Sequence, residues 1–191
     1  MTLRLAVIIG STRNGRFGPT VADWFTRQAA KRADLDLDVV DLATANLPDT
    51  LADTDEPTPA EVAVLAPRLA AADAFAVVAP EYNSSFPAPL KTALDWYYEE
   101  WHAKPVVLVT YGRETGGLYA AAQLRQVFTE LHAVTIHNTV TLPCYWEQFA
   151  ADGSWPRPSA GYDASVKNAL DQLVWWGEAL RDARTTRPYQ P

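Results

Sequence analysis

Hydrophobic and polar positions divide the chain into short apolar runs that alternate with longer amphipathic segments. Three runs are apolar almost throughout, at residues 3–9, 74–79 and 105–110, which is typical of strands buried on both faces of a sheet. Residues 35–40 begin instead with strict alternation of Leu and Asp, so one face of this strand contacts water and we expect it near a sheet edge. A weaker strand is predicted at residues 134–140.

The amphipathic segments between these runs predict five helices. They cover residues 20–32, 59–72, 87–101, 117–131 and 163–184. For the second of them, Thr58 is a candidate N-cap and Pro59 occupies the first helical position. Strands that alternate with helices form a parallel sheet with helices on both faces. We therefore expect an α/β fold, and the length of 191 residues predicts that residues 1–191 form a single domain.

The topology also predicts where a ligand binds. Ligands of such sheets lie beyond the carboxyl ends of the strands. The chemistry is therefore expected in the three loops that follow Ile9, Ala79 and Thr110.

The first loop, Gly10–Gly18, joins a buried strand to the start of a helix. The amino end of a helix offers free amide groups and a positive dipole, which favour an anion. Ser11 adds a hydroxyl, and Arg13 and Arg16 add guanidinium groups suited to phosphate. The glycine spacing is close to that of a P-loop, but Arg16 and Phe17 stand where that motif requires Lys and Ser or Thr. The alternative is an ordinary glycine turn with arginines in solvent.

The second loop, Pro80–Lys91, places an aromatic ring and an amide directly after a buried strand. Tyr82 offers a flat face, and Asn83 can both donate and accept hydrogen bonds. Such a loop could read the polar edge of a planar ring. The alternative is a strand-to-helix turn in which Pro87 starts the helix.

The third loop, Tyr111–Gly117, ends in the glycine pair Gly116 and Gly117. Paired glycines permit a close approach of the backbone to a ligand. Alone, this pattern also fits a plain glycine-rich turn.

Composition excludes several other classes of function. The net charge of −7 disfavours nucleic acid and anionic membrane surfaces as partners, and no apolar run is long enough to span a membrane. Cys144 is the one cysteine, which predicts a reducing, cytoplasmic location. His102, His132 and His137 lack metal-ligand spacing, so no metal is expected. Residues 141–162 form a long, Trp-containing loop, which is typical of a functional or interface element.

The three loops together resemble those of the NADPH-dependent FMN reductase family. Gly10-Ser11-Thr12-Arg13 resembles the phosphate loop of that family. Pro80-Glu81-Tyr82-Asn83, with Ser85, Pro87, Leu90-Lys91, Ala93 and Asp95-Trp96, resembles its long second motif, and Tyr111-Gly112 with Gly116-Gly117 resembles its glycine loop. The resemblance extends from residue 3 to about residue 140. It implies a flavodoxin-like fold, with a five-stranded parallel sheet of order 2-1-3-4-5 and helices on both faces.

The resemblance also implies which residues bind FMN. Those implied at or near the phosphate are Ser11, Arg13, Arg16, Phe17 and Gly18. Those implied at the isoalloxazine ring are Pro80, Glu81, Tyr82, Asn83 and Ser84 on one side and Tyr111, Gly112, Gly116 and Gly117 on the other. No catalytic side chain is implied, because the cofactor carries the chemistry.

The function implied is that of an NAD(P)H-dependent FMN oxidoreductase. A hydride would pass from NADPH or NADH to FMN, and on to a small-molecule acceptor such as a free flavin, a quinone or an azo compound. The alternatives are a flavodoxin-type electron carrier without reductase activity and an α/β signalling or scaffold domain without flavin. The resemblance further implies a homodimer or a homotetramer. The aromatic cluster Trp96, Tyr97, Tyr98 and Trp101 is the candidate interface, although a helix with aromatics on several faces could also be core.

Overall fold

The computed structural model describes residues 2–53 and 55–191 and contains one five-stranded sheet in the order β2-β1-β3-β4-β5. All neighbouring strands pair in parallel. The strands are β1 (Leu3–Ile9), β2 (Leu35–Asp41), β3 (Ala74–Pro80), β4 (Pro105–Tyr111) and β5 (Val134–Leu142). The predicted strand order is therefore confirmed, and β2 lies at an edge as its alternating pattern predicts.

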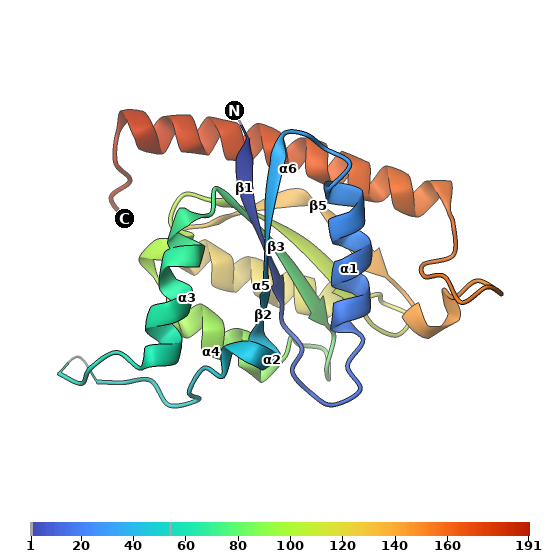
Figure 1. Cartoon of the computed structure of the whole chain (residues 1–191), viewed down its shortest axis with the longest axis horizontal. Coiled ribbons are helices and arrows are strands. Elements are labelled where there is room, and N and C mark those ends of the chain that lie inside the picture. The colour runs from blue at the N-terminus through green and yellow to red at the C-terminus, as the bar shows by residue number, and fades with distance from the viewer. Residues whose placement is uncertain (1, 54) are drawn as a thin grey trace.

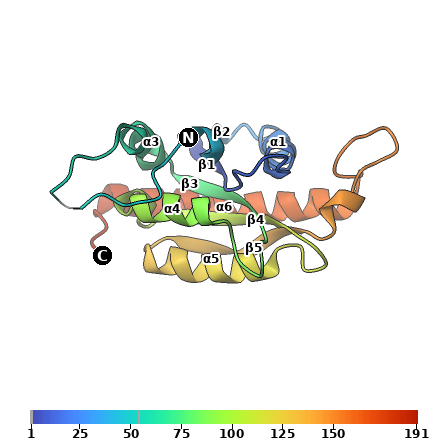
Figure 2. The same cartoon turned by 90° about the horizontal axis from the view of Figure 1, so that it is seen from below.

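Helices cover both faces of the sheet (Figure 1), and the sheet divides the hydrophobic core into two clusters, one on each face. The helices are α1 (Gly18–Ala29), α2 (Leu42–Ala45), α3 (Ala60–Ala71), α4 (Ala88–Trp96), α5 (Leu118–Glu130) and α6 (Ala160–Thr186), with short 3-10 turns at Glu99–Trp101 and Tyr145–Glu147. Helices α1 and α6 pack on one face, and α2, α3, α4 and α5 pack on the other. Figure 2 shows α6 running lengthwise, with the orange segment before it projecting past the sheet beside α1.

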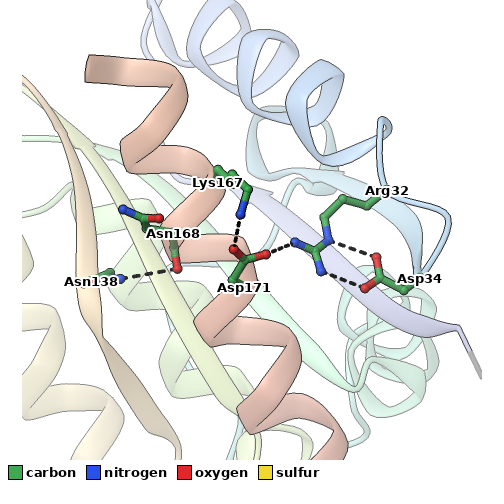
Figure 3. Close-up of polar contacts among 6 residues, drawn as sticks. All are labelled: Arg32, Asp34, Asn138, Lys167, Asn168 and Asp171. Carbon is green, nitrogen blue, oxygen red and sulfur yellow. Dashed lines mark hydrogen bonds and ion pairs between the residues drawn. The ribbon is translucent and has the colours of Figure 1, made fainter. Parts of the chain in front are cut away.

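An ion-pair network fastens α6 to the turn between α1 and β2 (Figure 3). Arg32 binds both carboxylate oxygens of Asp34, at 2.7 and 2.9 Å, and also pairs with Asp171 on α6. Lys167 pairs with the same Asp171 at 2.6 Å, one helical turn away. Because several charges share one network, this contact fixes the helix better than an isolated surface pair would.

The predicted helix over residues 87–101 is wrong at its carboxyl end. Helix α4 ends at Trp96, and Tyr97 adopts an extended conformation. The reason is tertiary packing: Tyr97 and Trp101 are only 2% and 1% exposed, and the Trp101 ring packs on Phe75 at a centroid distance of 4.7 Å. A continuous helix is replaced by a break that buries both rings. Of the candidate interface cluster, Tyr97 and Trp101 therefore belong to the core of this chain and not to an exposed surface.

The other helix boundaries differ by a few residues from those predicted. Helix α1 starts earlier, at Gly18, and α6 also starts earlier, at Ala160, where the Ser159 hydroxyl accepts hydrogen bonds from two amides of the first turn. The predicted N-cap role of Thr58 is wrong, because Pro59 occupies that position without a side-chain bond. The four-residue helix α2 was not predicted, since it is too short to show a periodic pattern.

A buried lysine, Lys104, caps the carboxyl end of helix α3. The Lys104 ammonium donates hydrogen bonds to the carbonyls of Leu69 and Ala70 in the last turn of the helix, at 3.0 and 2.8 Å, and the Leu69 carbonyl also accepts from the Ala72 amide. The side chain also lies over the Phe75 ring, at 5.5 Å from its centroid. Burial, reinforced by the nearby charge of Arg184, lowers the pKa of Lys104 to about 8. Folding therefore favours loss of a proton from this group.

The lowered pKa of Lys104 predicts how stability changes with pH. Between about pH 8 and the usual lysine value of about 10.4, the unfolded chain holds this proton and the folded chain releases it, so stability rises with pH. We expect the wild type to gain about 1–2 kcal/mol between pH 7.5 and 9.5 relative to Lys104→Met, from about 1.4 kcal/mol per pKa unit. Urea unfolding of both proteins at the two pH values checks this. Parallel pH dependence in the two proteins would contradict it.

Candidate functional site

A cleft of about 770 Å³ opens at the carboxyl ends of β1, β3 and β4. The loops after these strands are the three that the sequence singles out. The cleft is lined by Arg13, Phe17, Pro80, Glu81, Tyr82, Asn83, Ser84, Tyr111, Gly112, Arg113, Tyr145 and Trp146. Five of these twelve residues are aromatic, and two are arginines. In Figure 1 the first loop hangs below the sheet, in blue, at this carboxyl end.

The first loop is held by a bidentate ion pair with the end of β2. Both terminal nitrogens of Arg16 bind the Asp41 carboxylate at 2.6 Å, and one of them also donates to the Ser11 carbonyl at 2.8 Å. Burial alone would raise the pKa of Asp41, but its bonds with Arg16 and the Ala43 amide lower that pKa overall. The carboxylate is therefore charged at neutral pH. The Arg16 side chain faces Asp41 and does not line the cleft.

Ser11 and Gly18 meet beneath this loop. Ser11 is fully buried where β1 ends, and its hydroxyl accepts a hydrogen bond of 3.4 Å from the Tyr111 hydroxyl. A Cβ at Gly18 would lie 2.3 Å from the Ser11 oxygen, so only glycine lets helix α1 start this close to the strand end. The amino end of α1 is thereby aimed at the loop, which is the arrangement that binds anions.

Arg13 is exposed above the same loop. Its guanidinium lies over the Tyr82 ring at 5.0 Å from the centroid, and among the described residues no carboxylate pairs with it. Phe17 also lines the cleft and packs on Tyr145, with 4.6 Å between ring centroids. The first loop therefore offers a cation and an aromatic ring to one cleft.

The second loop contains a tight turn in an unusual conformation. Tyr82 and Ser85 exchange backbone hydrogen bonds of 2.8 and 3.0 Å, and the two residues between them, Asn83 and Ser84, both have positive φ, at 50° and 62°. Non-glycine residues with positive φ are strained and cluster at functional sites. The Gln123 amide donates to the Ser84 carbonyl at 2.8 Å and helps to hold the turn. The turn is therefore fixed in place at the rim of the cleft.

Glu81 joins the second loop to the third. One carboxylate oxygen accepts from the Thr115 hydroxyl and the other from the Tyr119 amide, each at 3.0 Å. The Tyr119 amide belongs to the first turn of α5, whose amides have no partner within the helix. A negative charge at this position also favours the helix dipole. Glu81 thus caps a helix that follows a different strand.

The third loop closes one side of the cleft with Tyr111 and Gly112. Burial raises the pKa of Tyr111, so its hydroxyl keeps its proton across the neutral range and donates to Ser11. Gly116 and Gly117 have φ values of 63° and 93°, and neither lines the cleft. A Cβ at Gly117 would lie 2.5 Å from the Thr110 Cβ, so this glycine lets α5 begin directly above β4.

An aromatic segment, residues 143–157, forms the wall that the sequence did not assign. Tyr145 and Trp146 line the cleft, and the Tyr145 ring lies 5.2 Å from that of Tyr111. The segment is anchored by buried Trp155, whose indole nitrogen donates to the Tyr145 carbonyl at 3.0 Å. The length and tryptophan content of residues 141–162 did indicate a functional loop. Its contact with the cleft depends on Phe17, a partner more than 120 residues away in sequence.

The predicted site residues fall into two groups. Those that line the cleft are Arg13, Phe17, Pro80, Glu81, Tyr82, Asn83, Ser84, Tyr111 and Gly112, and those that lie behind it are Ser11, Arg16, Gly18, Gly116 and Gly117. The sequence missed three lining residues, Arg113, Tyr145 and Trp146. Arg113 is flanked by the predicted glycines, so its position in the loop was the available signal.

The residues present fit an FMN group. A buried hydroxyl, an unpaired arginine and a helix amino end gather on the first loop, as a phosphate requires. Aromatic rings and a backbone turn line the rest of the cleft, as a planar heterocycle requires. The polar groups thus lie where the phosphate of FMN would bind, and the aromatic groups lie where its ring would bind.

The strained turn makes a prediction about stability. We expect Ser84→Gly to stabilise the protein by about 0.5–1 kcal/mol, because glycine adopts a positive φ without the cost of about 1–2 kcal/mol that other residues meet. Asn83→Gly should gain less, since asparagine tolerates this conformation better than serine. Urea unfolding of both variants checks the order. A loss of stability in Ser84→Gly would show that the serine side chain supports the turn.

Comparison with known proteins identifies the family. Residues 3–147 match the model of NADPH-dependent FMN reductases. An NAD(P)H-dependent FMN reductase of Schizosaccharomyces pombe is 35% identical over 155 residues, which is 75% of each chain. A 2-hydroxy-1,4-benzoquinone reductase of a Burkholderia species is 36% identical over 144 residues, 72% of this chain and 76% of its own.

Solved structures agree on the fold. FerB of Paracoccus denitrificans, a flavoenzyme NAD(P)H:(acceptor) oxidoreductase, superposes with a TM-score of 0.76 at 24% identity, covering 93% of this chain and 98% of its own. The expected flavodoxin-like fold, oxidoreductase class and FMN and NAD(P)H cofactors are confirmed. The chain belongs to the NADPH-dependent FMN reductase family.

Proposed function

We propose that the protein is an NAD(P)H-dependent FMN oxidoreductase of quinone-like acceptors, in which residues 1–191 act as one FMN-binding domain. The cleft at the carboxyl ends of β1, β3 and β4 is the observation that carries this proposal. The names of relatives support the acceptor class, since several are quinone reductases, one of them from Escherichia coli at 33% identity. The overall reaction transfers two electrons and two protons, from NAD(P)H and a solvent proton to the quinone, and yields NAD(P)⁺ and the hydroquinone.

The first loop is the proposed phosphate site. Arg13 is free of any carboxylate partner in the described chain and stands beside the amino end of α1, so it would supply the charge-assisted bonds to phosphate. Ser11 would donate or accept through its hydroxyl. Arg16, Phe17 and Gly18 would shape this site, because Arg16 holds the loop to Asp41 and Gly18 admits the helix.

The second and third loops are the proposed ring site. The turn Tyr82–Ser84 would contact one edge of the isoalloxazine with its backbone and the Asn83 amide. Pro80, Tyr111 and Gly112 would lie along the other side, with Glu81, Gly116 and Gly117 fixing the backbone behind them. When bound, FMN would supply a two-electron relay between NAD(P)H and the acceptor.

The protein positions and shields this chemistry. Tyr111 keeps its proton and donates a hydrogen bond to Ser11, and the aromatic segment, which packs on Phe17, would keep water from that side of bound FMN. No acid or base is required for the hydride step, so we assign no catalytic side chain. An electron carrier without reductase activity would share this cleft, and only an NAD(P)H oxidation assay separates the two. Catalytic oxidation of NAD(P)H with a quinone supports the proposal, and its absence in the FMN-loaded protein overturns it.

We further propose a cytoplasmic protein that forms at least a homodimer. A single cysteine suits a reducing compartment. No helix in the described part of the chain is long and apolar enough to cross a membrane. Exposed apolar side chains, among them Leu118 and Tyr119 at the start of α5 and Trp146 at the cleft, suit an interface between subunits.

Oligomeric state is directly measurable. Light scattering at micromolar concentration should give at least twice the 21.0 kDa of one chain. The variant Leu118→Glu should shift the population toward monomer, because it places a charge among the exposed apolar groups. A monomeric wild type would contradict the dimer and leave the cofactor assignment intact.

Arg13 separates recognition of phosphate from recognition of the ring. A charge-assisted bond is worth roughly 1.5–3 kcal/mol, so Arg13→Ala should weaken FMN binding about 10- to 150-fold. Riboflavin has the same ring without phosphate, and its affinity should change little. Asn83→Ala should weaken both ligands alike. Flavin fluorescence quenching measures all of these affinities.

The matched control is Arg27→Ala, which removes the same charge from an exposed position on α1 where Arg27 pairs with Asp23. It should leave both affinities near those of the wild type. Equal losses of FMN and riboflavin in Arg13→Ala would overturn the phosphate assignment.

A further inference from the structure

A second arginine stands at the cleft without a partner. Arg113 lines the cleft from the third loop and is exposed, and no carboxylate of the described residues pairs with it. The two arginines of the first loop have other contacts. Arg16 is bound to Asp41, and Arg13 lies over Tyr82 beside the proposed phosphate site. The proposed phosphate site uses Arg13 and gives Arg113 no role.

Arg113 is fastened to the aromatic segment. The Cys144 amide donates to the Arg113 carbonyl at 3.0 Å, and the Gly112 amide donates to the Leu142 carbonyl at 3.3 Å. These bonds join the third loop to the start of the wall formed by Tyr145 and Trp146. The Trp146 ring lies 5.1 Å from that of Tyr145 and is 45% exposed, so it offers a flat apolar face at the cleft.

The charge balance at this place selects a particular kind of ligand. Glu81 is the one carboxylate among the described residues that line the cleft, and its oxygens are bonded to Thr115 and Tyr119. The net charge of the protein is −7, so the positive charge of Arg113 makes the cleft a local site of attraction for anions. Glu114 and Glu147 lie close enough to raise the pKa of the neighbouring Cys144 thiol, after burial as the larger cause. They would repel a multiply charged diphosphate more strongly than a single negative charge.

We propose that Arg113 and Trp146 form a subsite for an acidic aromatic acceptor, a planar ring that carries one negative charge. Carboxylated quinones and 2-hydroxyquinones, which are vinylogous acids ionised at neutral pH, belong to this class. Trp146 stacks on the ring, and Arg113 binds the anionic oxygen. This inference rests on the proposed function, because it names which acceptors the same cleft prefers.

Binding without turnover is the first test. The probes are 2-naphthoate and 2-naphthamide, which share a ring and a shape and differ in charge. Calorimetry with the FMN-loaded protein should show the anion bound about three- to tenfold more tightly than the amide, a range set by the exposure of Arg113. In Arg113→Gln the two affinities should become equal, and Arg113→Lys should keep part of the preference. Trp146→Ala should weaken both probes alike.

The matched control is Arg187→Gln. Arg187 lies at the opposite end of the sheet, beside Ala103 and His132, and its substitution makes the same change in net charge. This variant should keep the preference of the wild type. Added salt should reduce that preference in the wild type and leave Arg113→Gln unchanged. Equal binding of the two probes by the wild type, or an equal loss in Arg187→Gln, would overturn the proposal.

Kinetics distinguish the acceptor from NAD(P)H, which is also anionic. In stopped-flow experiments, Arg113→Gln should lower the ratio of rate constants for a 2-hydroxy-1,4-naphthoquinone over the neutral 2-methyl-1,4-naphthoquinone about three- to tenfold. A comparable loss in reduction of the protein by NADPH, with that ratio kept, would assign Arg113 to the nicotinamide cosubstrate and overturn the proposal. A protein that reduces neither quinone contradicts the proposed function, whereas one that reduces both without regard to Arg113 contradicts only this inference.

Discussion

The ion pair between Arg16 and Asp41 is the contact on which the site depends. The loop after β1 has no regular structure of its own, and it must hold a buried serine, an exposed arginine and a phenylalanine in three directions. Arg16 fixes this loop from two sides, through the Asp41 carboxylate and the Ser11 carbonyl. Since Asp41 also caps α2 by accepting from the Ala43 amide, one carboxylate organises the end of β2 and the start of the site. A bidentate, partly buried pair of this kind has the fixed geometry that single surface pairs lack.

The cleft itself follows from the path of the chain. From β1 the chain enters α1 on one face of the sheet, and from β3 it enters α4 on the other. The two loops therefore diverge from neighbouring strands, and a crevice opens between them, as is usual where the direction of strand order reverses. Glu81 and Tyr111 fix the walls of this crevice. Glu81, after β3, accepts a hydrogen bond from Tyr119, after β4, and Tyr111, at the end of β4, donates one to Ser11, after β1. The walls are thus cross-linked by hydrogen bonds between parts distant in sequence.

The sequence predicted the sheet and the three loops at the cleft because these depend on local signals. An apolar run such as residues 74–79 predicts a buried strand by itself, and the alternation at residues 35–40 correctly predicted an edge strand. The break after Trp96 could not be read, since it results from Trp101 packing on Phe75 and Phe128. The resemblance pointed to residues that contact the cleft and residues behind it without separating them. That distinction needs the orientation of each side chain: Arg13 lines the cleft over Tyr82, whereas Arg16 binds Asp41 outside it.

Residues 143–157 complete the cleft. The loops after β1, β3 and β4 form one part of it, and Tyr145 and Trp146, which follow β5, add a wall. Phe17 makes this possible, because its ring packs against Tyr145 and Trp155 at 4.6 and 4.9 Å and joins the first loop to the last. Trp155 in turn packs on Trp24 of α1, so the wall rests on the core. In the proposed arrangement these two parts have different tasks: the loops after β1, β3 and β4 would hold FMN, and the aromatic wall, with the charge of Arg113, would contact the acceptor that binds beside it.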